Sequence, residues 1–106
     1  MNPGKLNKRV ELQKVEREKD GAGGFKESEP ITFATTWASI DGLSGSEFRR
    51  AHQQMVELTH KITIRYRKDI DRTMFVSYEG RSFEIQYIEN QEERNRFLEL
   101  FCLERQ

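Results

Sequence analysis

The clearest strand pattern in the chain is VELTHKITIRYR, residues 56–67. Apolar and polar side chains alternate along it, which is the period of a β-strand with one face against a core. Three cations fall on the polar side, where they would share one outward face: Lys61, Arg65 and Arg67. The segment therefore predicts a strand with an apolar inner side and a basic outer side. The inner side is expected to carry Val56, Leu58, His60, Ile62, Ile64 and Tyr66.

Two more strands are expected upstream. Residues 8–15 alternate until Leu12, where the period of two breaks and indicates a bulge or a strand end. Residues 31–40 are rich in β-branched and aromatic side chains on both faces, which favours a strand that is partly covered on each side. Pro30 precedes this run, where its missing N–H costs least.

The stretch between these strands, residues 18–29, is rich in glycine and charge. This composition predicts a flexible excursion and not a tight hairpin, because glycine orders only at a high entropic cost. We take four residues as a candidate assembly loop: Gly21, Gly23, Gly24 and Phe25. A phosphate-binding loop is excluded, since no Gly-Lys-Ser/Thr follows and the next element is a strand.

The periodicity changes over residues 44–55. Phe48, Ala51 and Met55 recur at three- and four-residue spacing, and Ser44 with Glu47 matches a capping box. We therefore expect one short helix here.

Strand character returns after residue 67. Residues 73–89 alternate on both sides of Glu79-Gly80 and predict a hairpin. The apolar run over residues 96–104 fits a strand or a helix, and we prefer a strand because a sheet would otherwise end on an open edge. The expected fold is thus mainly β: one domain over residues 1–106, forming a small antiparallel β-barrel of five to six strands with one inserted helix. A β-sandwich is the alternative.

Composition limits the class of function. The 18 basic and 18 acidic residues cancel, which argues against a free-standing nucleic-acid-binding protein. The charges are nevertheless segregated, with a basic excess in residues 44–72 and an acidic excess in residues 73–106. Opposite patches on a neutral molecule suit head-to-tail packing of identical copies, and solvated faces are the simpler explanation.

The chain shows no catalytic or metal-binding constellation in its sequence. His52 and His60 are the only histidines, and His60 is expected as a structural residue on the core side of its strand. A zinc site needs more Cys and His ligands than the chain holds. Cys102, the single cysteine, is expected in the core. We expect a soluble, non-enzymatic protein without a cofactor, a signal peptide or a membrane contact, kept in a reducing compartment.

One surface stands out as a candidate interface. It combines the cations of the predicted strand with two cations and two apolar residues just upstream: Lys61, Arg65, Arg67, Arg49, Arg50, Phe48 and Met55. A basic strand face on a barrel is typical of single-stranded nucleic-acid binding, but such barrels also carry outward aromatic residues for base stacking. Here threonines alternate with the cations, so an acidic protein surface is the favoured partner.

Several segments in this order resemble the phage head-tail adaptor family, also called head-tail joining or head-completion proteins. They are the strand over residues 8–15, the glycine loop 20–24, TWASI (36–40), LSGSEF (43–48), THKITIRYR (59–67) and the hairpin YEGRSFEI (78–85). The resemblance spans about Leu6 to Leu103. The final strand departs most from it, being more apolar.

The resemblance implies a structural subunit without enzymatic activity or cofactor. Such a subunit would be made in the bacterial cytoplasm and would dock as a ring between portal and tail in the virion, where its loops help close the DNA channel. Implied partners are portal or connector proteins, a tail-completion protein, other copies of the chain and, transiently, packaged DNA. The alternatives are a single-stranded nucleic-acid-binding barrel and, with less support, an SH3-like interaction module.

Overall fold

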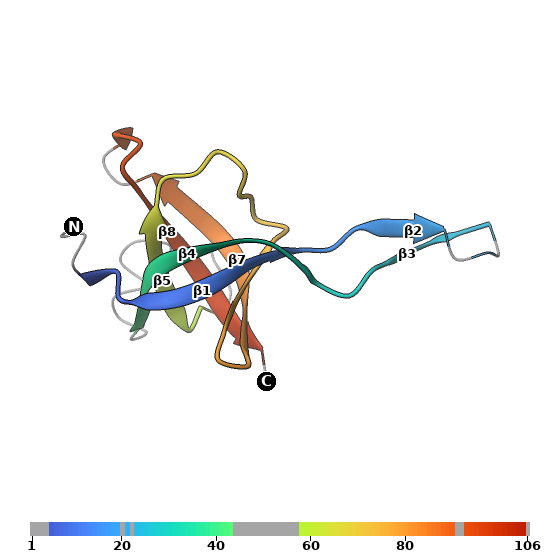
Figure 1. Cartoon of the computed structure of the whole chain (residues 1–106), viewed down its shortest axis with the longest axis horizontal. Coiled ribbons are helices and arrows are strands. Elements are labelled where there is room, and N and C mark those ends of the chain that lie inside the picture. The colour runs from blue at the N-terminus through green and yellow to red at the C-terminus, as the bar shows by residue number, and fades with distance from the viewer. Residues whose placement is uncertain (1–4, 20, 22, 44–57, 91–92, 106) are drawn as a thin grey trace.

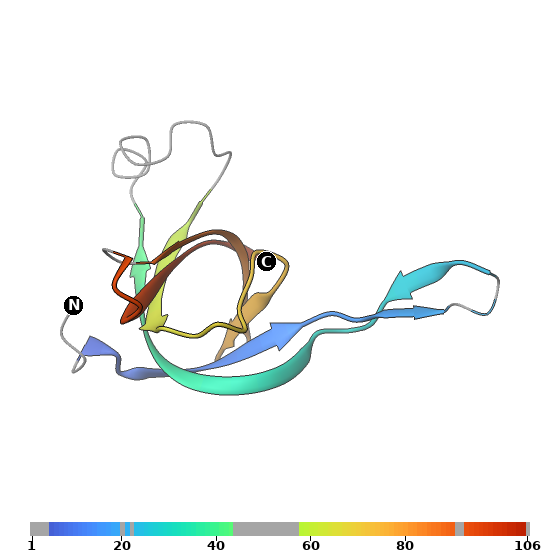
Figure 2. The ribbon, with the colours of Figure 1, turned by 90° about the horizontal axis from the view of Figure 1, so that it is seen from above.

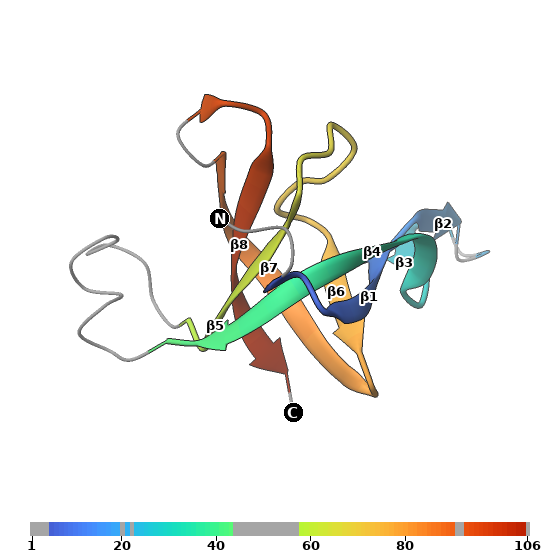
Figure 3. The same cartoon turned by 60° about the vertical axis from the view of Figure 1, so that its left-hand side comes forward.

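Of the eight strands in the described part of the chain, six close into an antiparallel barrel in the order β1-β4-β5-β8-β7-β6 (Figures 1 and 3). The computed structural model describes residues 5–19, 21, 23–43, 58–90 and 93–105. The strands are β1 Lys8–Lys14, β2 Arg17–Lys19, β3 Phe25–Glu27, β4 Ile31–Gly42, β5 His60–Arg65, β6 Phe75–Tyr78, β7 Arg81–Asn90 and β8 Phe97–Arg105. The predicted mainly β barrel is confirmed, whereas the helix predicted at 44–55 lies outside the described residues.

The core fills the inside of this barrel. Alternate residues of every barrel strand point inward, and the largest that are fully buried include Phe83, Leu12, Ile62, Ile64 and Leu100. A small barrel of this kind is packed with side chains and leaves no channel through its middle. None of the described residues forms a helix long and apolar enough to cross a membrane.

Strand β5, His60–Arg65, covers the middle of the strand predicted over residues 56–67, and residues 56 and 57 lie outside the described part of the chain. Within β5 the inward half of the pattern is confirmed and the outward half is wrong at one position. Ile62 and Ile64 are fully buried as expected. Thr63, expected on the exposed side, is also fully buried, beside Ser39 across the β4–β5 ladder. The two hydroxyls have no hydrogen-bond partner among the described residues. The outward side of β5 is therefore closed to solvent at this level.

Strand β8 is a central strand of the barrel wall. It pairs with β5 on one side and with β7 on the other, which confirms the strand preferred for residues 96–104. Its apolar run follows from this position, since Leu98, Leu100 and Cys102 face the core while Phe97 and Phe101 are buried on the opposite face. β8 thus has a neighbouring strand on both sides, and the described C-terminal strand is not an open sheet edge.

The hairpin predicted around Glu79-Gly80 is confirmed. Strands β6 and β7 pair from Tyr78↔Arg81 to Phe75↔Glu84. Glu79 and Gly80 have positive φ angles of 47° and 80°, as a two-residue turn between twisted strands requires. Figure 3 shows this turn near the end of β8, at the barrel end opposite the β5–β6 and β7–β8 loops.

The excursion at residues 18–29 is a ribbon and not a strandless loop. Strands β2 and β3 pair from Arg17↔Glu27 to Lys19↔Phe25 and form a separate two-stranded sheet. The ribbon continues the β1–β4 pair beyond Lys14↔Ile31 and projects from the barrel (Figures 1 and 2). We call residues 15–29 the arm. The bulge predicted near Leu12 is confirmed as a register shift at Leu12/Gln13.

Candidate functional site

The predicted basic face of β5 is largely neutralised by the chain itself. The Nζ atom of Lys61 lies 3.4 Å from Oε2 of Glu99 on the neighbouring strand β8. Arg67, just after β5, donates from Nε and Nη2 to the two carboxylate oxygens of Asp69 at 2.9 and 2.8 Å. This contact raises the pKa of Arg67 and lowers the pKa of Asp69. Arg65 is exposed between them, so it is the cation of this face most open to a partner.

The charge segregation along the sequence is not a segregation in space. β5, from the basic segment, lies directly beside β8, from the acidic one. Lys61 meets Glu99 for that reason. Within the acidic segment, Arg81 binds Glu104 and Arg105 binds Glu84 at 3.0 Å. The expected pair of opposite patches is therefore wrong for the β5–β8 wall of the barrel.

The other predicted site residues belong to the segment 44–57 and to the arm. Phe48, Arg49, Arg50 and Met55 lie outside the described residues, so their part in an interface stays a prediction. Of the predicted assembly loop, Gly21 and Gly23 adopt positive φ angles of 83° and 87° at the tip of the arm. Gly24 precedes β3, and Phe25 begins that strand. The structure thus places all four loop residues at the outer end of the arm.

The arm is anchored at its root by one serine. The hydroxyl of Ser28 accepts the N–H of Glu16 at 2.9 Å and donates to the carbonyl oxygen of Glu29 at 3.0 Å. The N–H of Ser28 in turn donates to the carbonyl oxygen of Glu16 at 2.7 Å. These bonds bridge the gap between the β1–β4 ladder and the β2–β3 ladder. The arm is therefore hydrogen-bonded along most of its length.

An exposed aromatic surface lies on the outer side of β1 and β4, where we predicted partial cover. Trp37 is 49% exposed and Ile31 is 41% exposed, and they are the exposed large apolar residues of the described chain. The guanidinium carbon of Arg9 lies 5.4 Å from the centre of the Trp37 ring. The strand period placed Ile31 and Trp37 on one face, but it did not show which face was outside. Tryptophan and arginine are enriched among the residues that contribute most to binding at protein–protein interfaces.

His60 belongs to a hydrogen-bonded cluster at one end of the barrel. Its Nδ1 atom lies 2.9 Å from Oγ1 of Thr59 and 3.9 Å from Oε1 of Glu104, and its ring packs edge-on against Phe83. The Nε2 atom faces Nη2 of Arg81 at 3.4 Å. In a catalytic triad the hydroxyl and the carboxylate contact opposite ring nitrogens of the histidine. Here Thr59 and Glu104 both lie on the Nδ1 side, so the cluster does not have that arrangement.

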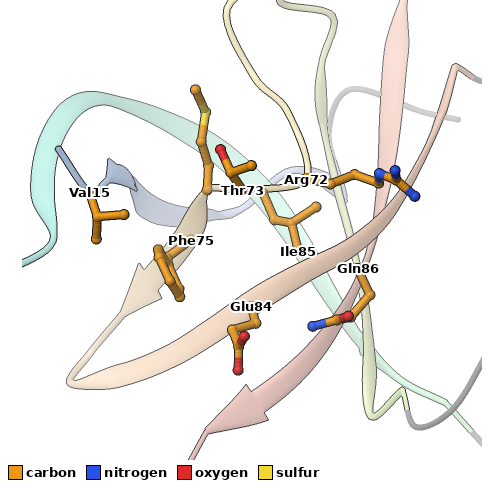
Figure 4. A pocket seen from close by; sticks show the side chains of 8 residues that line it. Val15, Arg72, Thr73, Phe75, Glu84, Ile85 and Gln86 are labelled. Carbon is orange, nitrogen blue, oxygen red and sulfur yellow. The ribbon is translucent and has the colours of Figure 1, made fainter. Parts of the chain in front are cut away.

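A pocket of about 300 Å³ lies where the arm leaves the barrel (Figure 4). It is lined by Val15, Arg72, Thr73, Met74, Phe75, Glu84, Ile85 and Gln86. The apolar half comes from the arm root and the barrel edge, and Arg72, Glu84 and Gln86 supply polar groups. Among the described residues, no three His, Cys, Asp or Glu side chains gather closely enough to hold a metal ion. No residue pattern in the sequence indicates this pocket, because its lining residues from the ends of β1, β6 and β7 meet only through tertiary pairing.

Comparison with known proteins gives a consistent result. Residues 1–105 match the family of phage head completion proteins. The solution structure of protein SF1141 from Shigella flexneri 2a superposes with a TM-score of 0.80 and 30% identity, covering 98% of this chain and 96% of that one. A chain in the virion of a native gene transfer agent particle superposes with a TM-score of 0.66 and 25% identity, covering 91% of each chain. No match is found among curated proteins.

Proposed function

This chain belongs to the phage head completion protein family, and from that premise we propose that it docks as a ring between the portal and the tail and helps close the DNA channel. The family is structural and is not an enzyme family, and a chain of similar fold is part of a gene transfer agent virion. The observation that carries the proposal is the match over residues 1–105, since it includes the barrel and the arm together. The proposed partners are portal or connector proteins, a tail-completion protein and further copies of the chain.

The structure supports this role through its division into a closed barrel and a projecting arm. The closed barrel satisfies its own strand edges over most of the wall, as a structural subunit requires. The arm adds reach, since the molecule measures 48 Å along its longest axis and 29 and 27 Å along the others. A projecting element is suited to contact a neighbour or to narrow a channel at the centre of a ring.

Deleting residues 20–24 tests the role of the arm in head-tail joining. The deletion removes the tip beyond β2 and leaves every barrel strand intact, so we expect an almost unchanged melting temperature. Cells that carry only this variant should accumulate DNA-containing heads without tails. Cells without the gene should give the same particles, and the wild-type gene should restore complete virions. Tailed, infectious particles formed in the absence of the gene would contradict the proposed function.

The basic surface of β5 is tested by reversing its charge. Arg65→Glu together with Arg67→Glu should prevent docking while the barrel stays folded, because neither side chain reaches the core. The control is Lys5→Glu with Arg105→Glu, which changes the net charge equally at exposed residues outside β5 and the loops next to it. Joining of tails to purified heads is the readout. If the doubly reversed protein completes heads as well as the control does, this surface is not an interface.

The nucleic-acid alternative loses support from the ion pairs on the same surface. Lys61 and Arg67 already have carboxylate partners, so binding a phosphate there would release fewer counterions than three free cations would. A titration with single-stranded DNA at increasing salt separates the two functions. Micromolar binding with a steep negative salt dependence would favour the alternative.

A further inference from the structure

A row of two arginines and one tryptophan crosses the outer face of β1, β4 and β5. Arg9 on β1 pairs in register with Trp37 on β4. The β4–β5 ladder ends one residue short of Trp37, and its register carried one step further places Arg65 beside the indole on the other side. Neighbouring strands lie about 4.8 Å apart, so roughly 10 Å separates the backbones of the two arginines, with the indole between them. We call Arg9, Trp37 and Arg65 the cationic row.

The charge of the cationic row is not compensated by the part of the chain that the structure describes. Trp37 is 49% exposed, and both arginines are exposed. Arg9 donates to Oγ1 of Thr35 at 2.9 Å, but neither Arg9 nor Arg65 forms an ion pair with a carboxylate of the described residues. The row is therefore suited to a partner that brings a carboxylate together with an apolar or aromatic side chain.

Such a combination lies on the opposite wall of the barrel. β7 is three strands from β4 in either direction of the strand order, and Figure 2 shows β4 along one side of the barrel and β7 with β8 along the other. Tyr87 and Glu89 share the outer face of β7, because Ile88 between them packs against the core. The ring of Tyr87 packs on that of Phe101, with 5.8 Å between the ring centres. This contact holds the tyrosine in place beside the exposed carboxylate of Glu89.

Glu89 carries a negative charge that the subunit does not neutralise. It lies directly opposite Glu99 in the β7–β8 ladder, and like charges in that position destabilise a sheet. Glu99 is bound by Lys61, whose Nζ atom lies 3.4 Å away, whereas Glu89 has no ion-pair partner among the described residues. A cation from outside the subunit would relieve this repulsion.

The other charges around Glu89 cancel. Glu84, the second acid of β7, is bound to Arg105 at 3.0 Å. Residues 91–96, which follow β7, hold two acids and two arginines and add no net charge. Glu89 is therefore the acidic group of β7 that remains open to a partner.

We infer that the outer face of β4 in one copy binds the outer face of β7 in the next copy. The carboxylate of Glu89 lies between Arg9 and Arg65, and the indole of Trp37 packs against the ring of Tyr87. The two surfaces differ and lie on opposite walls, so each subunit offers both, and repetition closes a ring where the rotation permits. This inference rests on the proposed function, and it identifies the surfaces through which the ring would form.

Packaged DNA fits the cationic row less well than a carboxylate does. DNA binding draws on the neutralisation of many phosphates, and the row holds two cations. Glu11 is exposed on the same face of β1, two residues from Arg9, and would repel a phosphate backbone. The row therefore matches a single carboxylate better than a polyanion.

Photo-cross-linking in assembled particles tests the contact. The chain with p-benzoylphenylalanine in place of Trp37 replaces the wild-type chain, and purified virions are irradiated and analysed by mass spectrometry. We expect a covalent dimer of the chain, linked at residues 86–90 of the second copy. It should form about tenfold more than with p-benzoylphenylalanine at Asp41, because bound surfaces face each other at a high effective concentration. Asp41 is the control because it is exposed at the far end of the same strand.

A charge exchange tests the same contact independently. Arg9→Glu with Arg65→Glu should lower the joining of tails to heads at least about tenfold, because two carboxylates would then face Glu89. Glu89→Arg alone should also lower it, since three cations would meet. The triple variant restores opposite charges and should recover most of the joining, whereas Glu11→Gln, the control on β1, should join tails as the wild type does. A triple variant that is no better than the double variant overturns the pairing.

The outcomes of cross-linking separate the inference from the proposed function. Virions that contain the Trp37 variant but yield no linked dimer above the control overturn the inference and leave the connector role intact. A cross-link from this position to a different virion protein or to DNA also overturns it. Absence of the wild-type protein from purified virions overturns the proposed function itself. All substituted side chains are exposed, so melting curves of the variants should match that of the wild type.

Discussion

Lys61 on β5 and Glu99 on β8 form an ion pair across neighbouring strands, although they come from oppositely charged segments of the chain. The side chain of Glu99 is only 16% exposed and that of Lys61 is 32% exposed. A pair this well covered is screened less by salt than a fully exposed pair. Part of the positive charge of β5 is therefore neutralised within the subunit. Arg65 is the most exposed cation of this face.

Shortening a core side chain on β8 should destabilise the barrel strongly. Leu100 is fully buried and lies between Ile62 and Ile88 on the neighbouring strands. Leu100→Ala should lower the free energy of unfolding by about 2–5 kcal/mol, because it removes buried surface and leaves a cavity. Urea denaturation followed by circular dichroism measures the loss. Leu103→Ala, on the other face of the same strand, should cost less than half as much, and equal losses would contradict the inward packing of β8.

Substitutions at the two residues of the β6–β7 turn should change the stability of the protein in opposite directions. Gly80 has a φ of 80°, so Gly80→Ala should cost roughly 1 kcal/mol of stability although an added Cβ would meet no atom within 4 Å. Glu79 has a φ of 47°, which asparagine tolerates better than glutamate. Glu79→Asn should therefore stabilise the protein by about 0.5 kcal/mol. Thermal melts of the two variants measure both effects, and a shift of the same sign in both would refute this description of the turn.

The ion pair between Arg81 and Glu104 should make stability depend on acid pH. Hydrogen bonds from Arg81 lower the pKa of Glu104 from its ordinary 4.5. Folding thus favours the ionised carboxylate, so its contribution is present above pH 4.5 and is lost as the pH falls through the lowered value. The difference in urea midpoint between wild type and Glu104→Gln should shrink from pH 7 to pH 3. Glu11→Gln, exposed on β1, serves as the control.

An independent measurement uses the arginine. Arg81→Met should move the pKa of Glu104 back toward 4.5, as followed by NMR titration of its side-chain carboxyl. An unchanged titration curve would show that Arg81 is not the cause of the lowered pKa.

Cys102 should be chemically silent in the folded protein. Its side chain is fully buried, and burial raises the pKa of the thiol, so little thiolate forms and reagents cannot reach it. Labelling with iodoacetamide at pH 8, followed by mass spectrometry, should be at least ~100-fold slower than at an introduced Asp41→Cys thiol. In denaturing urea both thiols should react at similar rates. Rapid labelling of native Cys102 would place β8 differently from the structure.

Much of the fold could be predicted because alternation is a local property. The period of two correctly indicated β1, β4, β5, the β6–β7 hairpin and the bulge near Leu12. What alternation cannot show is which strands become neighbours, since that depends on contacts between residues far apart in the chain. The central place of β8 between β5 and β7, and with it the Lys61–Glu99 pair, followed only from the structure.

The candidate site was less predictable for two physical reasons. The exposure of an outward side chain depends on what covers the strand, so Thr63 was expected at the surface and is fully buried, whereas Trp37 was expected under partial cover and is 49% exposed. A glycine-rich segment is compatible with a loose loop and with the tip of a ribbon. Residues 18–29 form a ribbon because Ser28 and the β2–β3 ladder supply hydrogen bonds to the backbone. No residue pattern in the sequence indicates these bonds.

The continuity of the arm with β1 and β4 has a mechanical consequence. Tension along the arm is delivered to two of the six barrel strands, and β1 is held by seven residue pairs to β4 but by three to β6. A load along the arm acts parallel to these strands, and the β1–β6 seam has fewer residue pairs to resist it than the β1–β4 ladder. We therefore expect this seam to open first when the arm is pulled.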